Sequence, residues 1–254
     1  MKISLIQTAL AWENPVENKN HFTQLIDTIH ETDLIILPEM FSTGFTMNAA
    51  AVAEPMDSET VTWMKQLSAE KNCAVTGSVV IEEDGKYYNR LLFVEPGGTI
   101  RTYDKRHLFT LAGENKTYTK GVNRTIIEYR GWKICPLVCY DLRFPVFSRN
   151  TEDYDLLLYV ANWPEPRIAA WDVLLKARAI ENMCYVAGVN RIGQDNNGHN
   201  YPGHSVVIDY LGHALGEAHE EEMVLTIVLR KDLLNDTREK FGFLNDRDSF
   251  NLLS

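Results

Sequence analysis

Two continuous apolar runs, each preceded by an aspartate, constrain the fold of this chain more than any other feature. The first is Asp33-Leu-Ile-Ile-Leu37, which Pro38 ends, and the second is Asp155-Leu-Leu-Leu-Tyr-Val160. Strands that are apolar on both sides are typical of parallel sheets covered on both faces. The residues that follow, Pro38-Glu39 and Asn162-Trp-Pro-Glu165, are also alike. We therefore expect two similar β-α-β halves.

Two such halves predict an α/β (α+β) fold in which two sheets pack face to face and helices cover the outer faces, a four-layer α-β-β-α sandwich. No Pro/Ser-rich or low-complexity tract divides the sequence, so we expect a single domain over residues 1–254. Apolar spacing and turn residues locate the elements. Helices are expected at 16–31, 60–71, 167–182 and 231–240, and strands at 2–8, 33–37, 73–82, 87–94, 99–104, 125–129, 132–138, 155–160, 184–190, 204–209 and 223–228.

The composition restricts the partners of the protein. A net charge of −10 and a pI of about 5.2 argue against electrostatic binding of nucleic acid and disfavour an anionic membrane surface. The N-terminus does not resemble a signal peptide and no segment reaches the length of a membrane span, so we expect a cytoplasmic protein. The four cysteines are scattered in apolar runs, unlike a disulfide framework, and Cys135 and Cys139 lack the second pair of a zinc site.

Cys139 directly follows the apolar run 132–138, and the polar residues and Pro145 beyond it indicate a turn into a helix. Such a turn exposes a side chain and leaves backbone N–H groups unpaired around it, which suits a nucleophile. Cys139 is therefore the candidate nucleophile. The backbone N–H of Tyr140 is a candidate donor to the oxyanion that forms when the sulfur attacks a carbonyl.

Two charged residues stand at the ends of other predicted strands, where the active sites of α/β sheets usually lie. Glu39 follows Pro38, and Lys105 follows the strand at 99–104. A thiol with a pKa of about 8.5 is mostly protonated at neutral pH and needs a base or a nearby cation. We expect Glu39 to accept the thiol proton and Lys105 to stabilise the oxyanion. With Cys139, they suffice to hydrolyse an amide through a thioester, without a metal or a cofactor.

The segments around these three residues resemble the catalytic blocks of the nitrilase (carbon–nitrogen hydrolase) superfamily, whose members use a Glu-Lys-Cys triad. The blocks occur in the family's order, and the resemblance covers nearly the whole chain. Lys105 lies in a charged run typical of a solvated face, so its assignment depends mainly on this resemblance. The similar segments are 37–41, 103–109, 113–117, 138–145, 161–164, 176–182 and 203–205.

Within the superfamily the chain is most similar to bacterial Nit-type ω-amidases, particularly in segments 161–164, 171–175 and 243–248. The resemblance implies hydrolysis of the terminal amide of 2-oxoglutaramate or 2-oxosuccinamate to a 2-oxo acid and ammonia. It also implies the four-layer sandwich and a homodimer. The family carries a second glutamate near the triad, in the position of Glu114. We expect Glu114 to hold Lys105 charged and oriented, and the alternatives are that it positions the substrate or only stabilises a loop.

Three residues are candidates for contact with the substrate. Arg143 lies one helical turn beyond Cys139, and a guanidinium pairs with a carboxylate through two parallel hydrogen bonds. Trp163, at a predicted strand end, and Phe41 are candidate walls of the pocket. Each has a plainer alternative, because most arginines are exposed and aromatic residues often fill a core. His107 is expected to form structural hydrogen bonds rather than to act as a base.

The residues alone leave other functions open. The same chemistry would serve an N-carbamoyl amino acid hydrolase or a deaminated-glutathione amidase. A different class is a non-catalytic binding protein on the same fold, which the reactive residue type at every triad position disfavours. A thiol oxidoreductase that uses Cys135 and Cys139 is a weaker alternative, because Cys73, Cys135 and Cys184 lie in apolar runs and are expected to be inert core residues.

Overall fold

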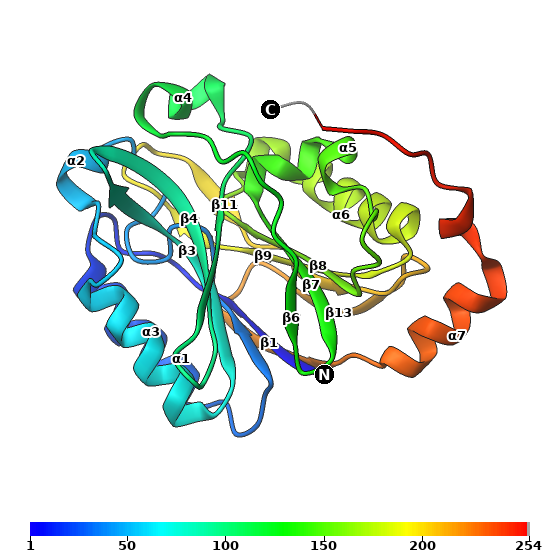
Figure 1. The fold of residues 1–254 in the computed structure, drawn as a ribbon. Helices are drawn as coiled ribbons and strands as arrows, with labels where there is room; N and C mark the ends of the chain where they lie inside the picture. Colours follow the sequence, from blue (N-terminus) through cyan, green and yellow to red (C-terminus); the bar gives the residue numbers. More distant parts are fainter. Residues whose placement is uncertain (253–254) are drawn as a thin grey trace.

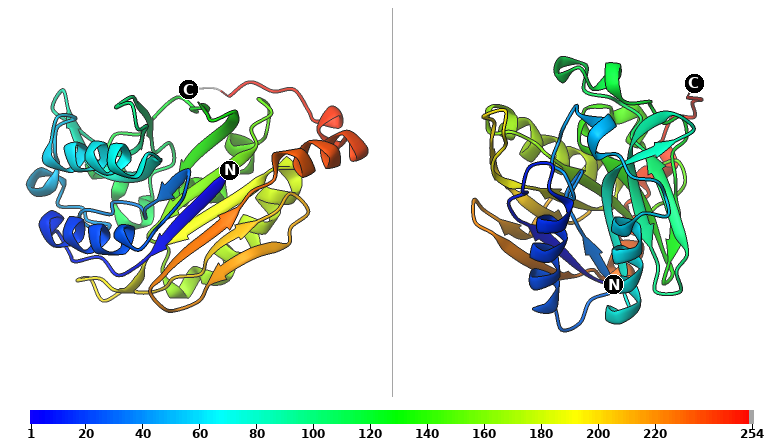
Figure 2. Two further views of the ribbon diagram at one scale, coloured as in Figure 1. Left: turned by 90° about the horizontal axis from the view of Figure 1, so that it is seen from below. Right: turned by 90° about the vertical axis from the view of Figure 1, so that its left-hand side faces the viewer.

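Two sheets packed face to face form the centre of the computed structural model, which describes residues 1–252 (Figures 1 and 2). In spatial order, the first sheet consists of β14 (Met223–Val228), β1 (Lys2–Gln7), β2 (Leu34–Ile36), β3 (Ala74–Glu83), β4 (Lys86–Val94) and β5 (Ile100–Asp104). The second consists of β13 (Ala214–Ala218), β12 (Ser205–Ile208), β9 (Tyr185–Asn190), β8 (Leu156–Ala161), β7 (Trp132–Val138) and β6 (Ile127–Tyr129).

Each sheet has a parallel centre and antiparallel edges. β2 runs parallel to β1 and β3, and β8 runs parallel to β7 and β9. The outer strands pair antiparallel to these. The two apolar runs that dominate the sequence are therefore the middle parallel strand of each sheet, buried on both faces. The two halves have the same internal arrangement, as predicted.

Helices form the two outer layers. α1 (Pro15–Asp27) and α3 (Glu59–Lys71) cover the first sheet, and α6 (Ile168–Asn182) covers the second; Figure 1 shows them on opposite sides of the paired sheets. Gly188 allows α6 to approach β9 closely, because a Cβ at this position would lie 2.5 Å from Leu175 Cδ1. One apolar cluster joins the inner faces of both sheets. The predicted four-layer α-β-β-α sandwich is confirmed.

The matching aspartates explain the similarity of the two halves. Asp33 Oδ2 accepts the backbone N–H of Lys2 at 2.7 Å, and Asp155 Oδ2 accepts that of Lys133 at 2.9 Å. Each carboxylate thus fixes the start of the neighbouring parallel strand, β1 or β7. The backbone N–H of each aspartate donates to the same neighbour's carbonyl, at 2.8 Å in both halves. The aspartate that precedes each apolar run therefore makes the same backbone contacts in both halves.

Several small elements were not predicted. Strand β13 reads Ala-Leu-Gly-Glu-Ala and is mostly exposed, so it has no apolar alternation and depends on pairing with β12. The predicted helix at 16–31 ends earlier, at Asp27. The other additions are the hairpin of β10 (Ile192–Gln194) and β11 (Asn200–Pro202), and the short helices α2 (Ala49–Val52), α4 (Glu114–Thr117) and α5 (Pro145–Ser148). Beyond them, α7 (Lys231–Phe241) matches the predicted C-terminal helix. Among the described residues, no helix has the length and apolar character to cross a bilayer.

Candidate active site

Cys139 stands where β7 ends and a 3-10 turn, η2 (Cys139–Arg143), begins. Its φ is +45°, a left-handed conformation that costs a non-glycine residue about 1–2 kcal/mol. The turn places the sulfur at the wall of a cavity, partly exposed, 3.9 Å from the backbone oxygen of Asn162. Tyr140 is the second residue of the turn, so its backbone N–H lies at the end of the helix where N–H groups lack intrahelical partners.

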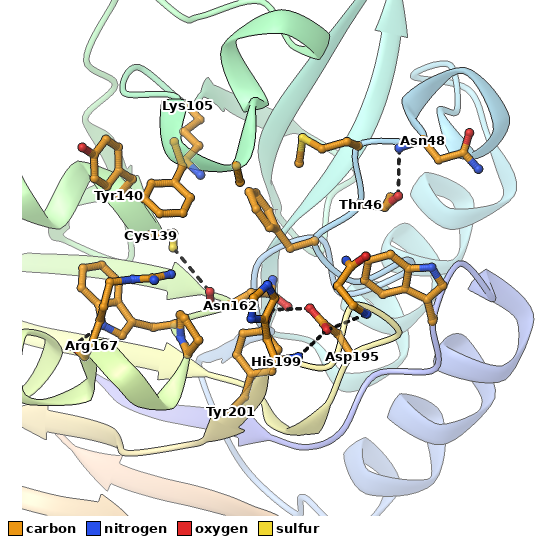
Figure 3. A pocket seen from close by; sticks show the side chains of 18 of the residues that line it. Thr46, Asn48, Lys105, Cys139, Tyr140, Asn162, Arg167, Asp195, His199 and Tyr201 are labelled. Carbon is orange, nitrogen blue, oxygen red and sulfur yellow. Dashed lines mark hydrogen bonds between the residues drawn. The ribbon is translucent and has the colours of Figure 1, made fainter.

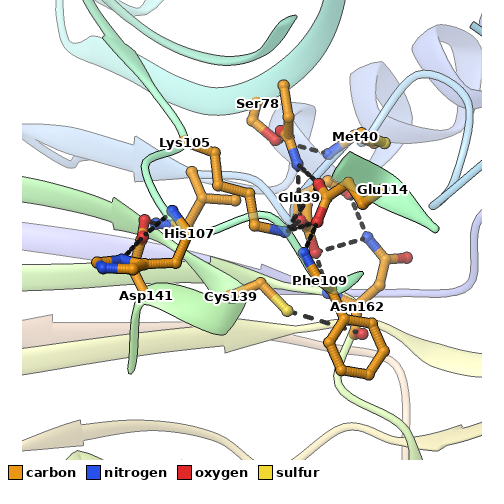
Figure 4. Close-up of polar contacts among 12 residues, drawn as sticks. Glu39, Met40, Ser78, Lys105, His107, Phe109, Glu114, Cys139, Asp141 and Asn162 are labelled. Carbon is orange, nitrogen blue, oxygen red and sulfur yellow. Dashed lines mark hydrogen bonds and ion pairs between the residues drawn. The ribbon is translucent and has the colours of Figure 1, made fainter. Parts of the chain in front are cut away.

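The buried carboxylate of Asp141 holds this turn in place (Figure 4). Its Oδ2 accepts the Val138 N–H at 3.0 Å and the Tyr103 hydroxyl at 2.7 Å. Its Oδ1 accepts the backbone N–H of His107 at 3.0 Å and contacts His107 Nδ1 at 2.7 Å. The His107 ring also stacks on Phe144. His107 thus makes the structural hydrogen bonds predicted for it, and Asp141 links the Cys139 turn to the segment after β5.

Glu39 follows β2 and is fully buried. Its Oε1 accepts hydrogen bonds from Lys105 Nζ and Asn89 Nδ2, both at 2.8 Å. Its Oε2 accepts the backbone N–H of Asn162 at 2.8 Å, and its own backbone oxygen accepts Asn162 Nδ2 at 2.7 Å. Asn162 follows β8, so the carboxyl ends of the two central strands, which lie in different sheets, meet at this carboxylate (Figure 4).

Lys105 lies between two buried carboxylates. Its Nζ is 2.8 Å from Glu39 Oε1 and 3.0 Å from each carboxylate oxygen of Glu114. Burial alone lowers the pKa of Lys105, but the charges of Glu114 and Glu39 more than offset this, so the pKa is raised and the ammonium persists. Burial raises the pKa of Glu114, with Lys105 opposing the rise. The structure thus places Glu114 in direct contact with Lys105.

Burial raises the pKa of the Cys139 thiol well above its ordinary value, and the neighbouring Glu39 carboxylate adds to the rise, while Lys105 opposes it. The resting thiol is therefore protonated at neutral pH. A thiolate can form here only if a neighbouring group accepts the proton.

The other cysteines lie in the core. Cys73, Cys135 and Cys184 are fully buried, and burial raises the pKa of Cys73 to about 11 and that of Cys135 to about 12. Cys135 and Cys139 are both free thiols in the structure, Cys135 in the core and Cys139 at the wall of a cavity. This separation of environments disfavours a redox pair, as the sequence also does.

A cavity of about 590 Å³ opens onto the sulfur (Figure 3). Lys105 and Cys139 reach its wall beside the aromatic side chains of Phe45, Phe109, Tyr140 and Trp163. The β10–β11 hairpin contributes Asp195, His199 and Tyr201. Two guanidinium groups, those of Arg143 and Arg167, also line the cavity. Within residues 1–252 no three His, Cys, Asp or Glu side chains gather in a way that would hold a metal ion.

Of the three residues predicted to contact the substrate, two line the cavity and one does not. Arg143 lines the cavity and lies 5.0 Å above the Trp163 ring, which forms part of the wall.

Phe41 does not line the cavity. The chain turns at Met40, where φ is +44°, and Phe41 packs on the outer side of the first sheet. It contacts Phe22 and Trp63 there, with ring centroids 5.7 Å apart in each case. Phe45 takes its place in the wall, with Lys105 Nζ 5.3 Å from its ring.

Two buried amides at the site were not assigned from the sequence. Asn162 was detectable in principle, because the similarity of the two apolar runs places it near the position of Glu39. Asn89 lies within β4, where it donates to Glu39 at 2.8 Å and to Glu114 at 3.3 Å. Its only signal was a polar residue at the start of an otherwise apolar stretch of strand.

Comparison with known proteins identifies relatives that match over nearly their full length. The sequence profile of the carbon-nitrogen hydrolase family matches residues 2–239. Omega-amidase YafV of Yersinia enterocolitica is 48% identical over 100% of this chain and 99% of its own length. A 2-oxoglutaramate amidase of Bacillus subtilis (strain 168) is 32% identical over 96% of each chain. The crystal structure of a CN-hydrolase superfamily protein from Xanthomonas campestris, with an arsenic adduct in its active site, has a TM-score of 0.97 at 44% identity and covers 99% of this chain and 98% of that one.

Proposed function

We propose that this chain, an amidase that belongs to the carbon–nitrogen hydrolase family, hydrolyses the terminal amide of small 2-oxo dicarboxylate monoamides such as 2-oxoglutaramate and 2-oxosuccinamate. The observation that carries the proposal is a single cavity that holds the Cys139 sulfur, with Glu39 and Lys105 behind it, together with guanidinium groups suited to a carboxylate. The activities named for the relatives from Yersinia enterocolitica and Bacillus subtilis support the same class of substrate.

The proposed reaction begins with transfer of the Cys139 proton to Glu39. The thiolate attacks the amide carbonyl, and the oxyanion receives hydrogen bonds from Lys105 Nζ and the Tyr140 backbone N–H. The C–N bond then breaks, Glu39 returns its proton to the nitrogen, and ammonia leaves a thioester on Cys139. Water, activated by Glu39, attacks the thioester, and the acid product leaves with the thiol restored. The sum is amide plus water to carboxylic acid plus ammonia.

The other residues hold this chemistry in position. Glu114 keeps Lys105 charged and directed at the reacting carbonyl. Arg143 binds the distal carboxylate of the substrate, supported by the face of Trp163. Because Arg143 belongs to the same 3-10 turn as Cys139, the anchor and the nucleophile keep a fixed separation.

The test is ammonia release by the purified protein from 2-oxoglutaramate and 2-oxosuccinamate, beside an N-carbamoyl amino acid and deaminated glutathione. We expect both 2-oxo monoamides to be preferred and Cys139→Ala to be inactive, with Cys73→Ala as a matched control that retains full activity. Activity in Cys139→Ala would remove this sulfur from the mechanism. Preferred turnover of the carbamoyl compound or of deaminated glutathione would replace the proposed substrate with that alternative.

We also propose that residues 1–254 form a single domain that acts as a homodimer in the cytoplasm. The resemblance to the family supports the dimer, and the net charge of −10 supports the absence of nucleic acid and anionic membranes among its partners. Light scattering on the purified protein measures the oligomeric state, and a monomer at micromolar concentration would contradict the proposal.

A further inference from the structure

The cavity contains two guanidinium groups without an acidic partner. Arg143 and Arg167 both line it and are half-buried. Within residues 1–252, neither forms an ion pair with a carboxylate; each lies instead 5.0 Å from an aromatic ring, Arg143 over Trp163 and Arg167 over Phe109. An aromatic face attracts a cation but carries no net charge. Both guanidinium groups therefore lack a directly paired anion, although the carboxylates of Glu13 and Asp195 also line the cavity.

The two groups belong to one assembly. Arg167 ends the 3-10 turn η3 (Glu165–Arg167), and its N–H donates to the Pro164 oxygen at 3.0 Å. Its backbone oxygen accepts the Trp163 indole N–H at 2.7 Å. Trp163 in turn supports Arg143, so the backbone of one arginine fixes the ring beneath the other. The Arg167 guanidinium is free to act in recognition, because main-chain atoms make the structural contacts.

One guanidinium is sufficient to engage a carboxylate, because it binds both oxygens through two parallel hydrogen bonds. In a simple monocarboxylate a second arginine can only share the remaining lone pairs of the same two oxygens. A 2-oxo acid adds a carbonyl oxygen on the carbon next to the carboxylate, which supplies an acceptor for a second donor fork.

We propose that Arg167 is the residue that selects for the 2-oxo group, while Arg143 binds the adjacent carboxylate. The proposal deepens the function given above and rests on it. It assigns substrate discrimination to an arginine outside the three catalytic blocks, on the turn that follows β8. It also gives a physical reason for the site to prefer a 2-oxo acid amide to the same amide without the oxo group.

Three substrates of equal chain length separate the roles: 2-oxoglutaramate carries both groups, glutaramate has only the carboxylate, and pentanamide has neither. Each is assayed by ammonia release with the wild-type protein, Arg143→Gln, Arg167→Gln and the matched control Arg101→Gln. Arg101 is an exposed arginine on β5, outside the cavity.

We expect Arg167→Gln to raise the KM for 2-oxoglutaramate by about 10- to 100-fold, the effect of losing one charge-assisted hydrogen bond. Its kcat for that substrate and its kcat/KM for glutaramate and pentanamide should change less than threefold. Arg143→Gln should impair both carboxylate substrates and spare pentanamide, and Arg101→Gln should change none of them. Equal losses on 2-oxoglutaramate and glutaramate in Arg167→Gln would overturn the proposal, as would losses on all three.

A binding measurement separates failure of this inference from failure of the proposed function. Calorimetry with the Cys139→Ala protein compares 2-oxoglutarate with glutarate, which differ only in the oxo group. We expect 2-oxoglutarate to bind at least tenfold tighter, and Arg167→Gln in the same background to remove the difference. A preference unaffected by Arg167→Gln would refute the inference even if turnover follows the proposed function. If glutaramate is hydrolysed and 2-oxoglutaramate neither reacts nor binds, both fail.

Discussion

The amino and carboxyl ends of the central parallel strands behave differently, although they belong to the same pair of strands. At the amino ends the two halves are alike: Asp33 and Asp155 make the same backbone contacts to β1 and β7. At the carboxyl ends they differ, because β2 leads to the acid Glu39 and β8 to the amide Asn162. The two halves are therefore alike where the contacts stabilise a sheet and different where the two sheets meet to form a site.

The cysteines follow the same division. Cys73 and Cys184 immediately precede β3 and β9, at corresponding amino ends, and both are fully buried. Cys139 follows the carboxyl end of β7 and reaches the cavity. Burial at one end makes a thiol inert, and access to a cavity and an acceptor at the other makes it reactive. Iodoacetamide at neutral pH is therefore expected to label Cys139 and spare Cys73 and Cys184.

The largest effect is expected for a change of charge at the carboxyl ends. Glu39→Gln keeps the shape of the side chain but cannot accept the thiol proton, so kcat for amide hydrolysis should fall by about 10⁴-fold. Ammonia release measures the loss, and thermal unfolding checks that the fold is intact. Glu70→Gln, an exposed glutamate on α3, is the control. Retention of a tenth of the wild-type kcat would show that another base serves the reaction.

Substitutions at the amino ends of the central strands should lower the stability of the fold without lowering kcat. Asp155 is buried and also pairs with Lys231 at 2.7 Å and Arg238 at 3.2 Å. Asp155→Asn removes the negative charge that pairs with both cations, which then retain only backbone carbonyl acceptors, and should lower the free energy of unfolding by about 3 kcal/mol. Asp33 is more exposed and pairs with Arg130, so Asp33→Asn should lower the free energy of unfolding by only about 1 kcal/mol. Urea unfolding measures both; a tenfold fall in kcat in either variant would break the division between the two ends.

A smaller effect is expected where the opposite sheet holds the base. Asn162→Ala removes the Nδ2 contacts to the Glu39 backbone oxygen and, at 3.5 Å, to Oε2, but retains the backbone N–H that donates to Oε2 at 2.8 Å. We expect kcat to fall about tenfold, with KM nearly unchanged, since the shorter contact to the carboxylate is kept. Asn162→Ser, which retains a short donor, should recover part of the rate. A loss equal to that of Glu39→Gln would mean that Asn162 takes part in the chemistry directly.

The smallest effect concerns the inert thiol at the amino end of β3. Burial raises the pKa of Cys73 in the folded protein to about 11 from 9.0, because the core favours the neutral thiol. The contribution of this thiol to the free energy of unfolding is therefore complete below pH 9 and is lost as the pH rises toward 11. Between pH 8 and 10 the wild-type free energy of unfolding should therefore fall by about 1 kcal/mol more than that of Cys73→Ala. Urea unfolding at the two pH values tests this. An equal fall in the free energy of unfolding for both proteins would show that the pKa of Cys73 is the same in the folded and unfolded states.

The same comparison explains how far the sequence could be interpreted. Apolar runs located β2 and β8, and the residues directly after strands pointed to Glu39 and Cys139, because these features are local along the chain. Lys105 was assigned mainly from the resemblance to the family. Asn89 depends on where β4 places one amide in space, and no local pattern encodes that. Phe41 was misplaced for a related reason. A single backbone angle at Met40 decides which face of the sheet the ring enters, and composition does not predict it.

Glu39 is held by a main-chain N–H that follows a strand of the opposite sheet. Its position, and therefore the activity, depends on how the two sheets are aligned. A small displacement of one sheet relative to the other would lengthen that hydrogen bond before the apolar interior opened to water. Catalysis should therefore vanish at denaturant concentrations that leave the far-ultraviolet circular dichroism intact. A damaged or partly unfolded molecule would lose its activity before its strands were exposed and could aggregate.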